Sequence, residues 1–316
     1  MKKIISLMLV FLLFFPCLSG CREKTDQETK IKIVTTVFPP YDFARAIAGD
    51  KAEITQLVRA GSESHSFEPT PDDVKKAQDC HLFVMIGGES ESWAERLAMA
   101  GNNEKGKTLV LTDYVTMLEA GSGEHHDETQ HAHHKHSHTH EHDEHIWTSP
   151  LNAIKMSEAI LKAICEIDGK NQEYYKANFE KLKSKLLDLD EQFKSIAQNS
   201  ENKTLIFGDR FPFLYLTLEY GFEYLAAFPG CNEQTQPDIK TIISLIEHIK
   251  DKKISTVFYT EFSTRQSANM LCEETGANAL LLHSCHNLTK DEWNRGETYI
   301  SLMENNIKNL KQYINS

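Results

Sequence analysis

The stretch NQEYYKANFEKLKSKLLDLDEQFKSIAQN, residues 171–199, decides how the rest of the chain is arranged. Its apolar side chains recur at alternating spacings of four and three, which places them on one stripe of a single helix; they are Tyr175, Phe179, Leu182, Leu186, Leu189, Phe193 and Ile196. At about 1.5 Å per residue such a helix is about 40 Å long, comparable to a whole domain. We expect it to join two halves of the chain, the alternative being a long surface helix of the first half alone.

Short β-rich runs alternate with helical stretches on both sides of this helix. They fall at Ile31–Val37, Glu53–Val58, Leu82–Ile86 and Leu109–Leu111 before it, and at Leu205–Phe207, Glu223–Phe228, Thr256–Tyr259 and Ala279–Leu282 after it. Ser149 and Pro150 are typical of a helix start. The expected fold class is α/β: two lobes with mainly parallel sheets, joined by one long rigid helix.

The amino terminus has the features of a secretory signal. Lys2 and Lys3 precede the apolar run 4–15, which is shorter than the roughly 20 residues of a membrane span. The sequence Leu18-Ser19-Gly20-Cys21 resembles the lipobox of bacterial lipoproteins, whose cysteine is acylated; an ordinary signal peptide or a short uncleaved anchor are the alternatives. We therefore expect an extracytoplasmic protein that is lipid-anchored to the cell membrane through Cys21.

These observations divide the chain into five expected parts. They are a lipoprotein signal peptide at 1–20, a tether at 21–30, an N-terminal α/β lobe at 31–170, a linking helix at 171–199 and a C-terminal α/β lobe at 200–316. The chain has 34 basic and 46 acidic residues, a formal charge of −12 that opposes binding to phosphate backbones. We therefore expect that the protein does not bind nucleic acid. We also expect it to be a monomer.

A histidine-rich stretch lies inside the expected first lobe. Ten of the 15 histidines fall in residues 121–145, GSGEHHDETQHAHHKHSHTHEHDEH, which lack apolar residues able to enter a core. Closely spaced imidazoles suit weak, exchanging capture of zinc, and a neutral solvated insert is the alternative. The auxiliary capture residues would be His125, His126, His131, His133, His134, His136, His138, His140 and His142.

Polar residues directly after strands are the best site candidates, because ligands of parallel sheets bind at the carboxyl ends of the strands. His65 follows the second strand, and His145 stands just before Ser149 and Pro150. In the second lobe the candidates are Asp209, Glu261 and His283. Imidazole and carboxylate ligands favour a borderline divalent ion such as Zn²⁺, whereas a carboxylate-rich site shifts the preference toward Mn²⁺.

Two of these segments carry a family resemblance. Residues 61–72, GSESHSFEPTPD, and residues 143–150, DEHIWTSP, together with the lipobox, resemble the metal-binding lipoproteins of bacterial zinc and manganese ABC importers, the cluster 9 substrate-binding proteins. The resemblance implies that a rigid helix joins two lobes, which hold one Zn²⁺ or Mn²⁺ in the cleft for delivery to an ABC permease. It also implies that His65 and His145 are the ligands of the first lobe.

The second lobe departs from the family's pattern. The family usually has a His or Glu where this chain has Gly208, and its last ligand, an aspartate, aligns with His283. We take His65, His145 and His283 as the core of the metal site, with Asp209 and Glu261 as further candidates. His286 or water could instead complete it, and Asp209 could pair with Arg210 or cap the next helix.

The resemblance also bears on the cysteines and on the choice of metal. Of the five cysteines after Cys21, it suggests a disulfide between Cys231 and Cys285, as in many zinc-specific members, and histidine-rich loops mark the same branch. The expected function is a high-affinity zinc receptor of an ABC importer, not an enzyme. A manganese receptor, a secreted zinc hydrolase and a metal-stabilised adhesin are the alternatives, although the chain has no HExxH or GxSxG motif.

Overall fold

The structure is a computed structural model that describes residues 30–64, 67–100, 106–121, 142–228 and 237–315. Residues 31–316 form one unit. The expected signal peptide and Cys21 lie outside the described residues, as do Cys231 and the histidines from His125 to His140. Within the described ranges, no helix is both long and apolar enough to cross a membrane.

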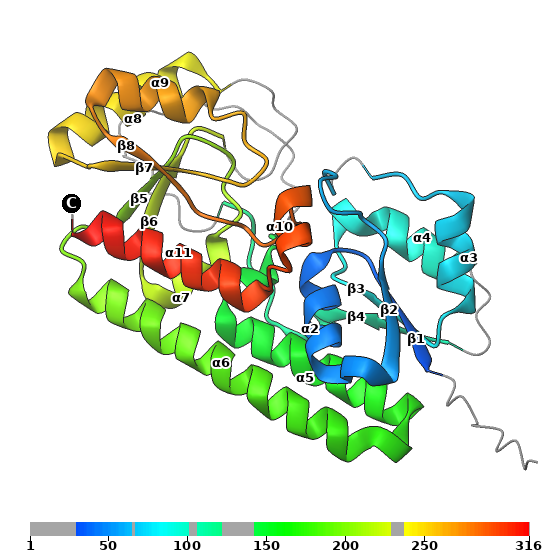
Figure 1. The fold of residues 1–316 in the computed structure, drawn as a ribbon. Helices are drawn as coiled ribbons and strands as arrows, with labels where there is room; N and C mark the ends of the chain where they lie inside the picture. The colour runs from blue at the N-terminus through cyan, green and yellow to red at the C-terminus, as the bar shows by residue number, and fades with distance from the viewer. Residues whose placement is uncertain (1–29, 65–66, 101–105, 122–141, 229–236, 316) are drawn as a thin grey trace, which may run out of the picture. The chain divides into compact units, whose positions relative to one another are not determined.

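The first lobe is built on a four-stranded parallel sheet with the order β2-β1-β3-β4 (Figure 1). Its strands are β1 Ile31–Thr35, β2 Ala52–Gln56, β3 Leu82–Met85 and β4 Lys107–Val110. Its helices are α2 Phe38–Ala48, α3 Pro71–Asp79, α4 Ser92–Ala100 and α5 Pro150–Ile167. The Ser149 side chain accepts a hydrogen bond from the Asn152 amide at 3.3 Å, so α5 begins at the expected cap.

The second lobe repeats this arrangement with the order β6-β5-β7-β8, again fully parallel. Its strands are β5 Thr204–Phe207, β6 Glu223–Ala226, β7 Thr256–Tyr259 and β8 Asn278–Leu281. Its helices are α7 Leu214–Tyr220, α8 Ile239–Lys252, α9 Gln266–Thr275, α10 Lys290–Arg295 and α11 Tyr299–Ile314. In both sheets the strand order reverses beside the first strand, which is where parallel sheets place ligand sites.

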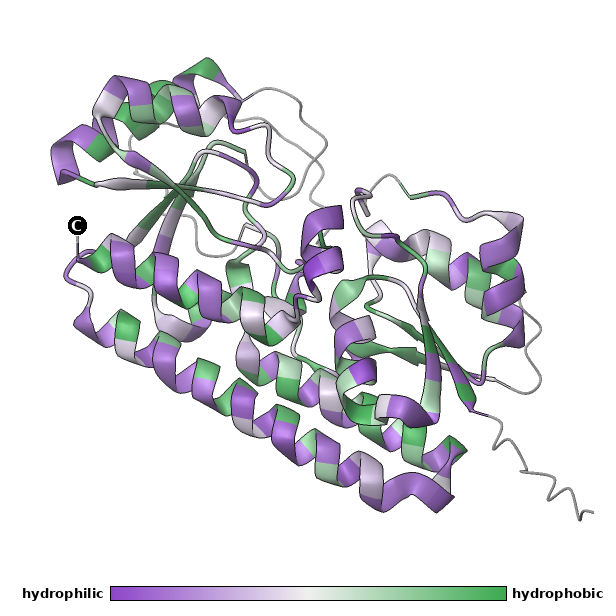
Figure 2. Ribbon diagram, in the orientation of Figure 1, coloured by the Kyte–Doolittle hydropathy of each residue, from purple (hydrophilic) through white to green (hydrophobic). Residues whose placement is uncertain are grey.

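Apolar residues fill the strands because helices cover these sheets. Figure 2 shows the strands mostly in the hydrophobic colour, while the helices carry hydrophobic residues on part of their surface only. All four residues of β3 and all four of β7 are buried. Near-continuous apolar strands are typical of parallel sheets with covered faces, and the α/β fold class expected from the sequence is confirmed.

The long helix α6, Gln172–Asn199, contains 28 residues and packs against both lobes. All seven apolar residues of the expected stripe are buried. On the side of the first lobe, the side chain of Asn178 in α6 donates a hydrogen bond to the Ile47 carbonyl of α2 at 3.1 Å. On the side of the second lobe, Asp190 in α6 accepts a hydrogen bond from the Tyr220 hydroxyl of α7 at 3.1 Å. The helix therefore joins the two lobes, and the alternative of a helix confined to the first lobe is excluded (Figure 1).

Adjacent leucines on α6 allow a matched test of this packing. Leu186 is fully buried in the stripe, whereas Leu187 is 43% exposed. We expect Leu186→Ala to lower the free energy of unfolding by about 2–5 kcal/mol, and Leu187→Ala to change it by about 0.5 kcal/mol or less. Urea unfolding followed by circular dichroism measures both, and equal losses from the two variants would contradict the role of the stripe.

Candidate functional site

A bridging segment, residues 284–288 between β8 and α10, connects the second lobe to the first. Two of its carbonyls accept hydrogen bonds from the first lobe. Trp147 Nε1 donates to the Ser284 carbonyl at 2.8 Å, and the Gly61 amide donates to the Leu288 carbonyl at 2.7 Å. The Asn287 side chain donates to the Arg59 and Ser62 carbonyls at 2.9 Å each. These contacts hold the bridging segment against the strand-end loops of the first lobe.

A small cavity of about 50 Å³ lies where these segments meet. Both lobes line it, with Glu63, Ser64 and His145 from the first and Arg210, Pro212, Thr260, Glu261, Phe262, Ser284, His286 and Asn287 from the second. Its volume is close to that of one or two water molecules, so it suits a single small ion better than an organic ligand. Two imidazoles and two carboxylates face this small volume.

His145 precedes the short 3₁₀ turn Ile146–Thr148 and is only 6% exposed. Asp143 accepts hydrogen bonds from the His145 amide at 2.8 Å and lies 3.1 Å from its Nδ1. A carboxylate at Nδ1 places the ring proton there and leaves the Nε2 lone pair for a metal, the usual arrangement behind metal-bound histidine. Asp143 belongs to the 143–150 motif, in which the sequence alone predicts no role for it; its position two residues before His145 is the signal that points to this contact.

His286 comes from the bridging segment and reaches the same cavity from the other lobe. Its ring lies perpendicular to that of His145, with the centroids 5.6 Å apart, and its Nδ1 is 3.3 Å from Ser64 Oγ. Two imidazoles on one tetrahedral zinc have centroids about 5 Å apart, given Zn–N bonds of about 2.0–2.1 Å. The observed pair is therefore close to the separation that a shared zinc ion requires.

Glu261, a further ligand candidate from the sequence, follows β7 and lines the cavity. Its side chain is 2% exposed, and both oxygens accept hydrogen bonds from Ser284, from the amide at 2.8 Å and from the hydroxyl at 2.5 Å. These bonds fix the carboxylate in the wall of the cavity that His145 and His286 also line. A buried carboxylate held in this way supplies negative charge to a cation without having to reorganise.

His283 and Asp209 lie near the cavity but are not among the residues that line it. His283 is buried behind Glu261, with its Nδ1 accepting from the Cys285 amide at 2.9 Å and its Nε2 3.4 Å from Glu292. Burial alone would raise the pKa of Glu292, but the hydrogen bonds from His283 and Thr289 outweigh it and lower that pKa to about 2. His283 thus contacts Glu292 of α10 on one side and lies 3.6 Å from the cavity-lining Glu261 on the other.

Asp209 ties the ends of two neighbouring strands together. Its Oδ2 accepts from the Thr260 amide at 3.1 Å and from the Thr260 hydroxyl at 2.6 Å, and its Oδ1 accepts from the Arg210 amide. These bonds engage both oxygens in holding the β5 and β7 ends. Beside it, a Cβ at Gly208 would stand 2.4 Å from Ala268 Cα of α9, so no ligand-bearing side chain fits at residue 208 unless α9 moves.

Two expectations remain to be placed. His65 falls outside the described residues, between Ser64 and Phe67. In the part of the chain that is described, no three His, Cys, Asp or Glu side chains are grouped closely enough to hold a metal ion.

Cys285 is a buried free thiol, in place of the disulfide partner that the resemblance suggested.

A second carboxylate pair supports the segment that carries His145. Glu144 accepts hydrogen bonds from the Ser90 amide at 2.9 Å and from the Ser90 hydroxyl. The neighbouring Glu91 is 3% exposed and accepts from the amides of Ile86 and Gly87 at 2.7 and 3.0 Å. Burial, with a smaller contribution from the Glu144 charge, raises the pKa of Glu91 to about 7.

Comparison with known proteins gives the family. The sequence profile of the family described as "Zinc-uptake complex component A periplasmic" matches residues 33–313. The chain belongs to this family. The resemblance found in the sequence is therefore confirmed over nearly the whole of the described chain.

Two relatives are about a third identical to this family member over the aligned residues. The zinc-binding lipoprotein AdcA of Streptococcus pneumoniae is 32% identical over 312 residues, covering 99% of this chain and 61% of AdcA. The chain thus spans about three fifths of the length of that relative. The high-affinity zinc uptake system protein ZnuA of Bacillus subtilis is 31% identical over 282 residues, covering 89% of this chain and 87% of ZnuA.

Solved structures agree with the fold of this family member. The Zn(II)-bound ZnuA-like domain of Streptococcus pneumoniae AdcA superposes with a TM-score of 0.75 at 30% identity, covering 91% of this chain and 100% of that domain. The metal-dependent lipoprotein YcdH of Bacillus subtilis gives a TM-score of 0.76 at 27% identity, covering 90% and 100%.

The raised pKa of Glu91 predicts a pH-dependent stability. Between pH 4.5 and 7 the unfolded chain loses a proton that folded Glu91 keeps, so the wild-type protein loses stability as the pH rises. Glu91→Gln lacks this penalty, and its stability relative to wild type should increase across that window, by about 1.4 kcal/mol per pH unit at the steepest. Urea unfolding at pH 4.5, 5.5 and 7 measures the difference. Glu95→Gln, at an exposed position of α4, is the control, and a difference that does not change with pH would contradict the assignment.

Proposed function

We propose that this protein is an extracytoplasmic receptor that binds one Zn²⁺ between its lobes and delivers it to the permease of an ABC importer. The observation that carries this proposal is the meeting of His145 and His286, from opposite lobes, in one ion-sized cavity. The names of the zinc-binding lipoprotein AdcA and the zinc uptake protein ZnuA among its relatives support it. Anchoring to the membrane through an acylated Cys21 belongs to the same proposal.

The proposed ligands are His145 and His286, with Glu261 as the neighbouring carboxylate and His65 as the remaining imidazole. His65 directly follows Ser64, which lines the cavity. An imidazole-rich site with one carboxylate favours Zn²⁺ over Mn²⁺, which prefers oxygen ligands. His283 and Asp209 would act indirectly, His283 by packing beside Glu261 at 3.6 Å and Asp209 by holding the ends of β5 and β7.

Such a receptor captures and releases its ion without chemical conversion. Each imidazole must be neutral at one nitrogen to bind the metal, so protonation in acid competes with Zn²⁺. Asp143 favours the proton on Nδ1 of His145, which presents Nε2 to the ion. The site would therefore bind zinc tightly near neutral pH and weakly in acid.

The two cavity histidines give the decisive test. We expect His286→Ala and His145→Ala each to weaken tight Zn²⁺ binding by more than about 100-fold, because loss of a ligand costs more than loss of a residue that supports one. Isothermal titration calorimetry with a competing chelator measures the affinity. His248→Ala on α8 is the control and should leave it unchanged. His283→Gln should have a smaller effect than His286→Ala, and the reverse order would transfer the ligand role to His283.

The histidine-rich stretch can be removed with little strain on the described fold. Glu119 and His142 form an isolated antiparallel bridge, and the Asp143 amide donates to the Leu118 carbonyl at 2.9 Å, so the two ends of the stretch are adjacent. We expect replacement of residues 122–141 by a short Gly-Ser linker to abolish weak zinc binding and to keep one tight site. Equilibrium dialysis measures the stoichiometry, and loss of the tight ion would contradict the division of roles.

A further inference from the structure

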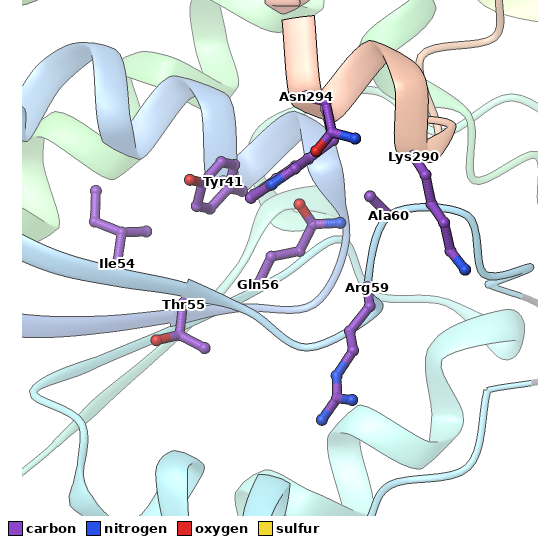
Figure 3. A pocket seen from close by; sticks show the side chains of 9 residues that line it. Tyr41, Ile54, Thr55, Gln56, Arg59, Ala60, Lys290 and Asn294 are labelled. Carbon is purple, nitrogen blue, oxygen red and sulfur yellow. The ribbon is translucent and has the colours of Figure 1, made fainter. Parts of the chain in front are cut away.

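A second, larger cavity of about 500 Å³ lies next to α10, the helix that follows the bridging segment (Figure 3). Its walls come from α2, from β2 with the loop that follows it, and from α10. A hydrogen bond from Gln56 Nε2 to Asn287 Oδ1 at 2.9 Å links it to the small cavity, because Gln56 lines the larger cavity and Asn287 the smaller. Its size is in the range of sites for small organic ligands, about 300–1,000 Å³.

Two cationic side chains lie at one end of this cavity. Arg59 and Lys290 are both exposed, and among the described residues neither the Arg59 guanidinium nor the Lys290 ammonium has a hydrogen bond or ion pair. The nearby carboxylates are already engaged: Asp72 pairs with Lys76 at 2.7 Å, and Glu292 accepts from Thr289. The Arg59 charge also acts on Asp72, but the ion pair of Asp72 is with Lys76, so this end of the cavity has two cationic side chains without an acceptor among the described residues, on a chain that is acidic as a whole.

The middle of the cavity has an acceptor that lacks a donor. Gln56 Nε2 donates to the Val58 carbonyl at 2.5 Å and to Asn287, which directs the amide oxygen away from both. Gln56 Oε1 is buried, and the described residues provide it with no hydrogen-bond partner. A buried acceptor without a donor costs about 1–3 kcal/mol, so a ligand N–H that reaches it, after a small shift of the side chains that cover it, would be favourable. Figure 3 shows the Gln56 amide between Tyr41 and Lys290.

The opposite end is aromatic. The rings of Tyr41 on α2 and Trp293 on α10 have centroids 5.3 Å apart at 34°, and Trp293 remains 41% exposed. An exposed indole beside a second ring provides a flat apolar surface on which a ligand ring can stack. The aromatic pair and the two cations thus face the same cavity from different ends.

We propose that this cavity is a second ligand site, which takes a planar organic carboxylate. The carboxylate binds Arg59 and Lys290, an N–H of the ligand donates to Gln56 Oε1, and the ring stacks on Trp293. The site is separate from the zinc cavity, so it does not depend on the proposed zinc function and can be tested on metal-free protein.

Hippurate is a suitable probe because it combines a carboxylate, an amide N–H and a phenyl ring. We expect calorimetric titration of the whole chain without metal to give a Kd on the order of 1 mM or tighter, and methyl hippurate, which lacks the charge, to bind at least 10-fold more weakly. Acetate, which has the charge alone, should show no binding at 10 mM.

Variants of the lining residues locate the binding. Arg59→Gln and Lys290→Gln should each weaken hippurate binding at least 5-fold, and Lys162→Gln, at an exposed position of α5, should not. Thermal unfolding of each variant verifies that the fold is intact. The proposal is overturned by absence of hippurate binding at 10 mM, by equal binding of the methyl ester, or by Kd values that neither cation variant changes.

Discussion

The attachment of the bridging segment to the first lobe is the constraint on which the site depends. Hydrogen bonds from Trp147, Gly61 and Asn287 fix residues 284–288 across the seam between the lobes. Without them, His286 would belong to a surface loop of the second lobe, and His145 would have no imidazole opposite it. The same bonds position the wall that the two cavities share. The site is thus made by contacts between backbone and polar side chains, with the apolar packing of α6 behind them.

Much of the fold was predictable because local pattern and tertiary structure agree. The apolar strands have covered faces on parallel sheets, and the seven-residue stripe of α6 required burial along the whole length of the helix. The Ser149 cap and the following proline marked the start of α5. These features depend on spacing along the chain, which a single sequence contains.

The site was only partly predictable. The end of a strand fixes the position of a residue at the edge of the sheet, but it does not fix the direction of that residue's side chain. Glu261 lines the cavity, while Asp209, at an equivalent strand end, turns toward Thr260. His286 reaches the cavity because the chain turns at Cys285, which has a positive φ of 60°, and no spacing rule indicates such a turn in a residue other than glycine. Residue 208 is a glycine because α9 packs closely against it. This contact could not be predicted from the sequence, since it forms only in the folded chain.

The anchoring of α6 on both lobes limits how far the two lobes can move apart. A wide hinge opening would pull the second lobe off the helix and expose stripe residues at about 1.5–3 kcal/mol for each side chain transferred to water. Small displacements of residues 284–288 would break only a few hydrogen bonds, each worth about 0.5–1.5 kcal/mol. In the receptor that we propose, we therefore expect the ion to be exchanged by a local movement, in which a short peptide shifts while the scaffold behind it stays in place.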